Sequence, residues 1–267
     1  MKQYGKMFIM KNRKIIWIII LLAVWQGIAI SGRFSPLIFP GLDMIIRSLV
    51  VSLSNGELIR ETLYSVIIIL EGLILGILLA AVMSIASVTS KWLRAFVETV
   101  TVLAHPLPGI ALLPIVILWL GTGRNSIMFI IVHSVVWPLL LNITAGFKST
   151  PAIYGEMAQN FGVRGVGLFK DVYLPASLPF LISGLKIAWA RAWRALISAE
   201  MIFGAVGGNG GLGWYIFKQR VFMDTAGMFS ALLVIMLIGI MIEEIVFKKI
   251  EAATIKKWGM AKYDGKN

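Results

Sequence analysis

The feature that most constrains this chain is a series of long apolar blocks with almost no charged residue. Residues 15–32, 99–123, 125–147 and 225–242 contain no Asp, Glu, Lys or Arg. A helix needs about 20 mostly apolar residues to cross the ~30 Å hydrocarbon layer of a bilayer. The blocks therefore predict membrane-spanning helices rather than the core of a soluble domain.

Two further blocks are apolar but carry charges. Residues 62–90 contain one charged residue, Glu71, and residues 178–203 contain four: Lys186, Arg191, Arg194 and Glu200. With these two blocks, the sequence predicts an all-α membrane protein with six transmembrane helices. The composition agrees, because 58% of residues are hydrophobic and only 14% are charged, whereas soluble domains carry about 25% charged residues. A cytosolic enzyme, a nucleic-acid-binding protein and a disordered chain are excluded.

The net charge of +12 is explained by membrane topology. Loops on the cytoplasmic side are enriched in Lys and Arg. Sixteen of these residues fall in one set of segments, 1–14, 85–98, 148–177 and 243–267. Six fall in the opposite set, 31–61, 121–126 and 205–224. We therefore expect both termini to be cytoplasmic.

The same pattern divides the chain into three parts. Residues 1–60 are expected to form an N-terminal anchor helix and an external segment. Residues 61–247 form the membrane core, which includes a long cytoplasmic loop at 148–177, and residues 248–267 form a basic cytoplasmic tail. The chain contains no cysteine, which excludes disulfides and thiolate metal sites.

The cytoplasmic loop contains a short helix signal. Residues from Glu156 to Phe161 can form a helix that ends at Gly162, because glycine tolerates the left-handed conformation at a helix C-terminus. Ala158 keeps one face of this helix thin, and apolar residues follow it. Such a helix either packs on the bilayer surface or docks in a groove of another protein.

The loop resembles a known motif. Glu156, Ala158 and Gly162, followed by Val172, Leu174 and Pro175, are similar to the EAA loop of permease subunits of bacterial ABC importers. Two positions depart from that motif, since Met157 replaces an alanine and Val172 replaces an isoleucine.

Further segments resemble the nitrate/sulfonate/taurine group of these permeases. They are Pro108 to Pro114 with Ile117 to Gly121, Ser198 to Met201, Gly211 to Gly213, and Trp258-Gly259.

The resemblance implies a type I importer permease fold in the plasma (inner) membrane of a bacterium. It implies a coupling helix that sits in a cleft of a separate ATPase, and it assigns the coupling role to Glu156, Met157, Ala158, Gly162, Val163, Arg164, Leu174 and Pro175. The implied assembly has two permease copies, two ATP-binding subunits and one external substrate-binding protein. The chain lacks the G-x-x-x-x-G-K-[ST] phosphate-binding loop. ATP and Mg are therefore expected on the partner, and no cofactor on this chain.

Two arginines fall within the fifth predicted span. Arg191 and Arg194 are three residues apart and share one helix face, about 20 Å along the helix from Leu178. A guanidinium near mid-membrane costs at least ~2.5–3.5 kcal/mol, so each should face water or a counter-charge. Either they line the pathway and attract an anion, or they pair with Glu200, Glu71 or a second copy of the chain.

Glu200 is a further candidate for the pathway or its gate. So are the helix-breaking prolines Pro108 and Pro114, together with Pro106 and Pro138. Packing kinks are the alternative explanation for the prolines. Gly208 to Gly213 spells G-x-G-x-x-G but follows no predicted strand, so we interpret it as an outer turn where a binding protein docks. His105 and His133 stand alone and are expected to pack between helices.

The sequence thus predicts a permease subunit that imports a small anion of the sulfonate, taurine or nitrate class and is not itself an enzyme. The same importer type for a thiamine-precursor pyrimidine or an aromatic acid is the alternative. An ion-coupled secondary transporter would need a buried carboxylate, for which Glu71 is the candidate. An intramembrane enzyme would need clustered catalytic groups on facing spans.

Overall fold

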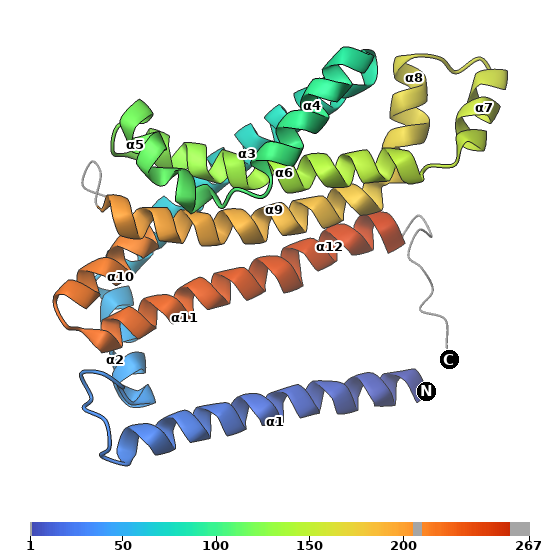
Figure 1. Cartoon of the computed structure of the whole chain (residues 1–267). Helices are drawn as coiled ribbons and strands as arrows, with labels where there is room; N and C mark the ends of the chain where they lie inside the picture. Colours follow the sequence, from blue (N-terminus) through green and yellow to red (C-terminus); the bar gives the residue numbers. More distant parts are fainter. Residues whose placement is uncertain (1, 205–209, 257–267) are drawn as a thin grey trace.

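The structure is a computed structural model that describes residues 2–204 and 210–256, all in helices and connecting turns with no strand (Figure 1). The elements in chain order are α1 (Lys2–Ile30), α2 (Leu42–Ser54), α3 (Glu57–Thr89), α4 (Lys91–Ala104), η1 (Gly109–Leu112), α5 (Leu113–Leu120), α6 (Arg124–Ser149), α7 (Ala152–Asn160), α8 (Val166–Leu168), η2 (Phe169–Tyr173), α9 (Leu174–Phe203), α10 (Gly211–Val221), α11 (Thr225–Met241), η3 (Ile242–Phe247), α12 (Lys248–Glu251) and η4 (Ala252–Lys256). The predicted all-α class is confirmed.

Four continuous helices in the described residues are long and apolar enough to cross a membrane: Glu57–Ser87, Arg124–Ser149, Lys170–Phe203 and Thr225–Thr254. A fifth crossing exists if the bent pair Lys91–Ala104 and Gly109–Leu120 is one span. The apolar part of α1, Ile15–Ile30, is shorter than the roughly 20 residues that a crossing needs. The chain is therefore a multi-pass membrane protein, and the sixth span, in α1, stays a prediction.

The third predicted span, 99–123, is not one straight helix. The chain bends by 89° between Lys91–Ala104 and Gly109–Leu120. Pro106 and Pro108 lie in this break and supply no backbone N–H to continue the hydrogen-bond ladder.

The other two candidate pathway prolines, Pro114 and Pro138, do not break a helix. Pro114 is in the first turn of α5, where its missing N–H would have no helical partner. Pro138 lies inside the continuous helix α6.

The centre of the molecule is the contact of α6 with α3 and α9, and glycines set its spacing. A Cβ added to Gly76 of α3 would lie 2.6 Å from Val135 Cγ1 of α6. A Cβ added to Gly184 of α9 would lie 2.8 Å from Asn142 Cβ. Helices in a membrane approach closely where small residues face a neighbour. These glycines therefore allow α6 to pack tightly on both sides.

Helix α1 joins the rest of the molecule at one end only (Figure 1). Trp25 stacks on Phe39, with ring centroids 4.2 Å apart, and meets Phe229 of α11 edge-on at 5.1 Å. Its indole Nε1 donates a hydrogen bond to the Pro40 carbonyl, at 3.1 Å.

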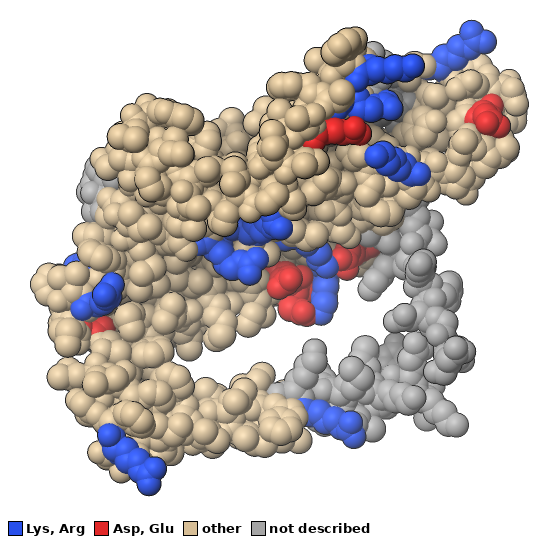
Figure 2. Space-filling model, viewed as in Figure 1, with Lys and Arg blue, Asp and Glu red and all other residues tan. Residues whose placement is uncertain are grey.

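The turns and helix ends lie at two opposite ends of the molecule. The turn from α3 to α4, helix α7, the start of α1 and the end of α12 lie at one end, whereas α2, α10 and the start of α6 lie toward the other (Figure 1). The segments richest in Lys and Arg therefore share one end, as the predicted topology requires. Figure 2 shows basic side chains gathered near α4 and α7 at this end, and a separate group midway along the visible face.

Candidate functional site

A cavity of about 430 Å³ lies at the break after α4, beside α6 and α9. The break contributes residues 105–110, α6 contributes His133, Ser134 and Trp137, and α9 contributes Arg191, Arg194, Ala195 and Ser198. The cavity lies at the 89° bend, where Pro106 and Pro108 interrupt the helix and the chain continues into η1 and α5, which pack against α6. Of the sequence-predicted path residues, the structure brings Arg191, Arg194 and Pro108 together here.

The two guanidiniums line this cavity and are exposed in the single chain. Arg191 Nη1 lies 3.5 Å from His105 Nδ1, and Arg194 Nε donates to the Ala190 carbonyl at 3.0 Å. Among the described residues, no carboxylate forms an ion pair with either arginine. The cavity is therefore lined by uncompensated positive charge.

The alternative pairing of these arginines with Glu71 or Glu200 is not seen among the described residues. Glu71 pairs instead with Arg124, and the Glu71 side chain is 41% exposed. This carboxylate is neither buried nor free, so it lacks the setting that an ion-coupled transporter requires.

Glu200 also lies elsewhere, and the structure does not bring it together with Arg191 and Arg194 in this cavity. It is completely buried and is not among the cavity residues. Ser65 Oγ of α3 donates to both of its carboxylate oxygens, at 2.7 and 2.9 Å, and the Gly213 N–H of α10 donates at 2.9 Å. Glu200 therefore ties α9 to α3 and α10. It does not join His105 and His133 in a catalytic cluster, and the described residues contain no group of three His, Cys, Asp or Glu able to hold a metal.

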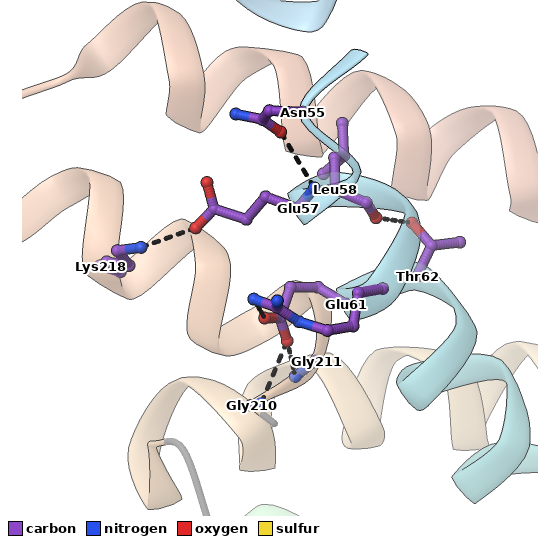
Figure 3. A network of polar contacts seen from close by, with 9 residues as sticks. Asn55, Glu57, Leu58, Glu61, Thr62, Gly210, Gly211 and Lys218 are labelled. Carbon is purple, nitrogen blue, oxygen red and sulfur yellow. Dashed lines mark hydrogen bonds and ion pairs between the residues drawn. The ribbon is translucent and has the colours of Figure 1, made fainter. Parts of the chain in front are cut away.

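A second buried carboxylate completes this contact. Glu61 Oε2 accepts hydrogen bonds from Gly210 N at 3.0 Å and Gly211 N at 2.8 Å (Figure 3). Leu212 N donates to Ser65 Oγ at 2.8 Å. Negative charge at a helix N-terminus satisfies its free N–H groups and opposes the helix dipole. The start of α10 is thus held by the protein's own carboxylates, and these N–H groups are not free to bind a phosphate.

Neither Glu61 nor Ser65 is predicted from the sequence as a functional residue. A charged residue at the margin of an apolar block was the only signal for Glu61. The prediction that Gly208 to Gly213 forms an outer turn falls partly on residues 205–209, outside the described residues, and Gly211 to Gly213 form the start of α10. Trp258-Gly259 also lies outside the described residues.

The loop at 148–177 contains the expected helix, which begins at Ala152 rather than at Glu156. Helix α7 ends at Asn160, and Gly162 follows with φ +82°. Gly162 N donates to the Gln159 carbonyl and Val163 N donates to the Ala158 carbonyl, each at 2.9 Å. This pair of bonds is the Schellman arrangement, in which a left-handed residue closes the helix C-terminus. The predicted glycine end is confirmed.

Helix α7 presents an apolar surface outward. Phe161 is 84% exposed and Met157 is 50% exposed, and Glu156 and Arg164 are also exposed. The helix rests on the chain through Gly155, where an added Cβ would lie 2.7 Å from the Tyr173 hydroxyl. Ala158 and Val163 are half-buried, and Leu174 and Pro175 begin α9.

Residues 72–256 match the protein family described as "Binding-protein-dependent transport system inner membrane component". This range contains α7, the cavity and both arginines. The chain belongs to this family.

Relatives cover most of the chain at similar identity. A putative aliphatic sulfonates transport permease protein of Escherichia coli is 28% identical over 82% of this chain and 82% of its own length. The taurine transport system permease protein of Escherichia coli is 27% identical over 84% and 82%. The formylaminopyrimidine transport permease protein of Halalkalibacterium halodurans is 27% identical over 85% and 88%.

Family membership makes this chain a membrane-spanning transport subunit and not an enzyme. Permeases of this family act with a binding protein and with a separate ATPase subunit. Energy and substrate capture are therefore supplied by other chains.

Proposed function

We propose that this permease subunit forms the membrane path for a small anion of the sulfonate, taurine or nitrate class. The observation that carries the proposal is the position of Arg191 and Arg194, which line one cavity without a carboxylate. Both belong to a helix, Lys170–Phe203, that is long enough to span the bilayer. Charged groups at such depth face a water-filled cavity or a partner, and an anionic substrate is a transient partner.

The arginines favour an anion over the alternatives. The named relatives transport aliphatic sulfonates, taurine and formylaminopyrimidine, at 27–28% identity to this chain, so identity alone does not select a substrate. A guanidinium donates two parallel hydrogen bonds to a sulfonate or nitrate group. An uncharged pyrimidine offers no such acceptor pair, so a pyrimidine precursor ranks behind an anion as the substrate. An aromatic acid carries a carboxylate and therefore fits the arginines.

The proposal assigns α7 to the ATPase. Its exposed Phe161 and Met157 give an apolar contact that fits a groove on a partner protein, and the tight turn at Gly162 fixes the direction in which the helix projects. Glu156, Ala158, Val163 and Arg164 flank that surface. ATP and Mg are held by the partner, and the end of the molecule with α7 and both ends of the described chain is cytoplasmic.

A second copy of the chain completes the path. The cavity is open in the single chain, and both guanidiniums are exposed. Lipid tails cannot cover them without a large cost in free energy. A homodimer with the two cavities facing each other satisfies this requirement, with two ATPases at the α7 end and a binding protein at the other.

Uptake into proteoliposomes that contain the complete importer tests the proposal. We expect Arg191→Gln and Arg194→Gln each to raise KM or lower the maximal rate by ~10-fold, because each removes a charge-assisted hydrogen bond. Arg47→Gln is the matched control, because Arg47 of α2 is exposed and lies outside the cavity. Unchanged kinetics in both cavity variants, at normal assembly, would refute the anion path.

A further inference from the structure

A second cavity lies along α4, toward the end of the molecule that carries α7. It measures about 500 Å³ and is lined by residues of α3, α4 and α6. Its charged residues are Arg94 and Glu98 of α4 and Lys148 of α6. Arg94 Nε donates to the Ser87 carbonyl at 3.1 Å, which holds the guanidinium at the cavity wall.

The two cavities follow one face of α6. His133, Ser134 and Trp137 line the first cavity, and Leu141, Thr144 and Lys148 line the second. From Ser134 onward these positions are separated by steps of three and four residues, which place their side chains on a single helix face. Helix α4 accompanies this face, because its C-terminal end meets the first cavity at His105 and its middle lines the second.

We propose that the second cavity is an inner binding site for the same anion, reached from Arg191 and Arg194 along the face of α6. This inference rests on the proposed anion path. The site would hold the oxyanion group between Arg94 and Lys148 before its release. Trp137 is the last α6 residue of the first cavity, and the second begins at Leu140, so a constriction between them would stand at Trp137.

The charges of the two cavities differ in the direction that release requires. The first cavity has two guanidiniums and no carboxylate in its lining, whereas Glu98 offsets part of the positive charge in the second. A transport site must bind its substrate weakly enough to let it leave. Glu98 therefore makes the inner site the weaker of the two.

An anionic lipid headgroup shares the chemistry of such a site. Basic pockets between helices at the cytoplasmic side of a membrane hold lipid phosphates, and Val97, Val102 and Leu140 of the same cavity would contact acyl chains. The two occupants differ in water access. A path for a small anion is open to hydrophilic reagents, whereas a seated lipid blocks them.

The absence of cysteine from the chain makes every introduced thiol the only one in this subunit. Thr144→Cys places a thiol in the inner cavity, and Ser134→Cys places one in the outer cavity. Ala145→Cys is the matched control on α6, since Ala145 is exposed but lines neither cavity. Each variant is assembled with its partner subunits in native-lipid membranes and treated with an anionic sulfonatoethyl or a cationic trimethylammonioethyl methanethiosulfonate. Rates are normalised to those of a free thiol.

We expect both cavity thiols to react at least about 10-fold faster than the Ala145→Cys thiol and to favour the anionic reagent. The normalised anion-to-cation ratio at Thr144→Cys should fall at least about twofold with Lys148→Gln and rise at least about twofold with Glu98→Gln, because a unit charge several ångströms away shifts the local potential in opposite senses. Opposite shifts from the two substitutions distinguish a charged, water-filled site from a general loss of folding.

Two results would overturn the inference. A Thr144→Cys thiol that is protected in native lipid but reacts after delipidation in detergent would assign the cavity to a lipid headgroup. A reactive thiol whose ratio ignores both Lys148→Gln and Glu98→Gln would show that no anion site exists there. These rates need no transported substrate, so failure of the anion path in the uptake assay remains a separate result.

Discussion

Replacing Glu200 by alanine should loosen the end of the molecule that carries α10. The Glu200 carboxylate is fully buried and accepts hydrogen bonds from Ser65 Oγ and from Gly213 N. In the alanine variant the Ser65 hydroxyl can turn to a carbonyl of its own helix, but the Gly213 N–H keeps no acceptor. An unpaired buried N–H costs about 1–3 kcal/mol, and the space left by the side chain adds roughly 1–2 kcal/mol.

We therefore expect Glu200→Ala to lower stability by about 3 kcal/mol, which corresponds to a fall of about 6–12 °C in Tm. The measurement is a thermal melt of the detergent-solubilised protein, followed by tryptophan fluorescence and by loss of the monodisperse species. Glu200→Gln retains an oxygen for the Gly213 N–H and should lose less than half as much. Glu156→Ala is the control, since Glu156 is exposed on α7. If Glu200→Ala melted at the wild-type temperature, the contact among α3, α9 and α10 would not stabilise the fold as argued.

Three further outcomes follow from the packing. Gly184→Ala should destabilise the protein by about 1–3 kcal/mol in the same melts, because its Cβ would lie 2.8 Å from Asn142 Cβ. Gly239→Ala is the control and should not destabilise, since nothing lies within 4 Å of the added Cβ. Equal Tm values for the two variants would contradict close packing of α6 on α9. Trp25→Ala should release α1 and expose its connection to limited proteolysis, since Trp25 makes the ring contacts at 4.2 and 5.1 Å; an unchanged cleavage pattern would show that other contacts hold α1. Gly162→Ala should fray α7 at a cost of about 1 kcal/mol, because alanine is strained at φ +82°, and unchanged amide exchange in α7 would refute this role.

Local signals made part of the structure predictable. The end of α7 at Gly162 follows from a glycine after a short helical run, and the break after α4 follows from Pro106 and Pro108. The all-α class follows from apolar blocks too long for strands. Each of these features is set by residues that are neighbours in the sequence, so the physical cause is visible without the fold.

Long-range features were not predictable in the same way. Glu61 reaches Gly211 across 150 positions of sequence, and no spacing rule links an acid at the start of α3 to a glycine turn before α10. Glu200, like Arg191 and Arg194, is a charged residue of the fifth predicted span and a candidate for the pathway. The structure separates them, since Glu200 turns toward α3 and α10 while the arginines face the cavity.

The bent third span shows the same limit. The prolines indicated that a helix would break, but the sequence did not give the 89° turn or the cavity that it opens. Those depend on how α5 packs against α6, which is a property of the assembled fold.

Purification of the tagged protein from native membranes tests the central claim most directly, namely that this subunit works with an ATPase through α7. The account predicts that an ATPase co-purifies with the wild type and with Ala145→Cys. It also predicts that the ATPase is lost with Phe161→Asp, which puts a charge on a side chain that is 84% exposed and therefore leaves the fold intact. Recovery of the subunit alone from the wild type under every mild detergent condition, or undiminished recovery of the ATPase with Phe161→Asp, would contradict it.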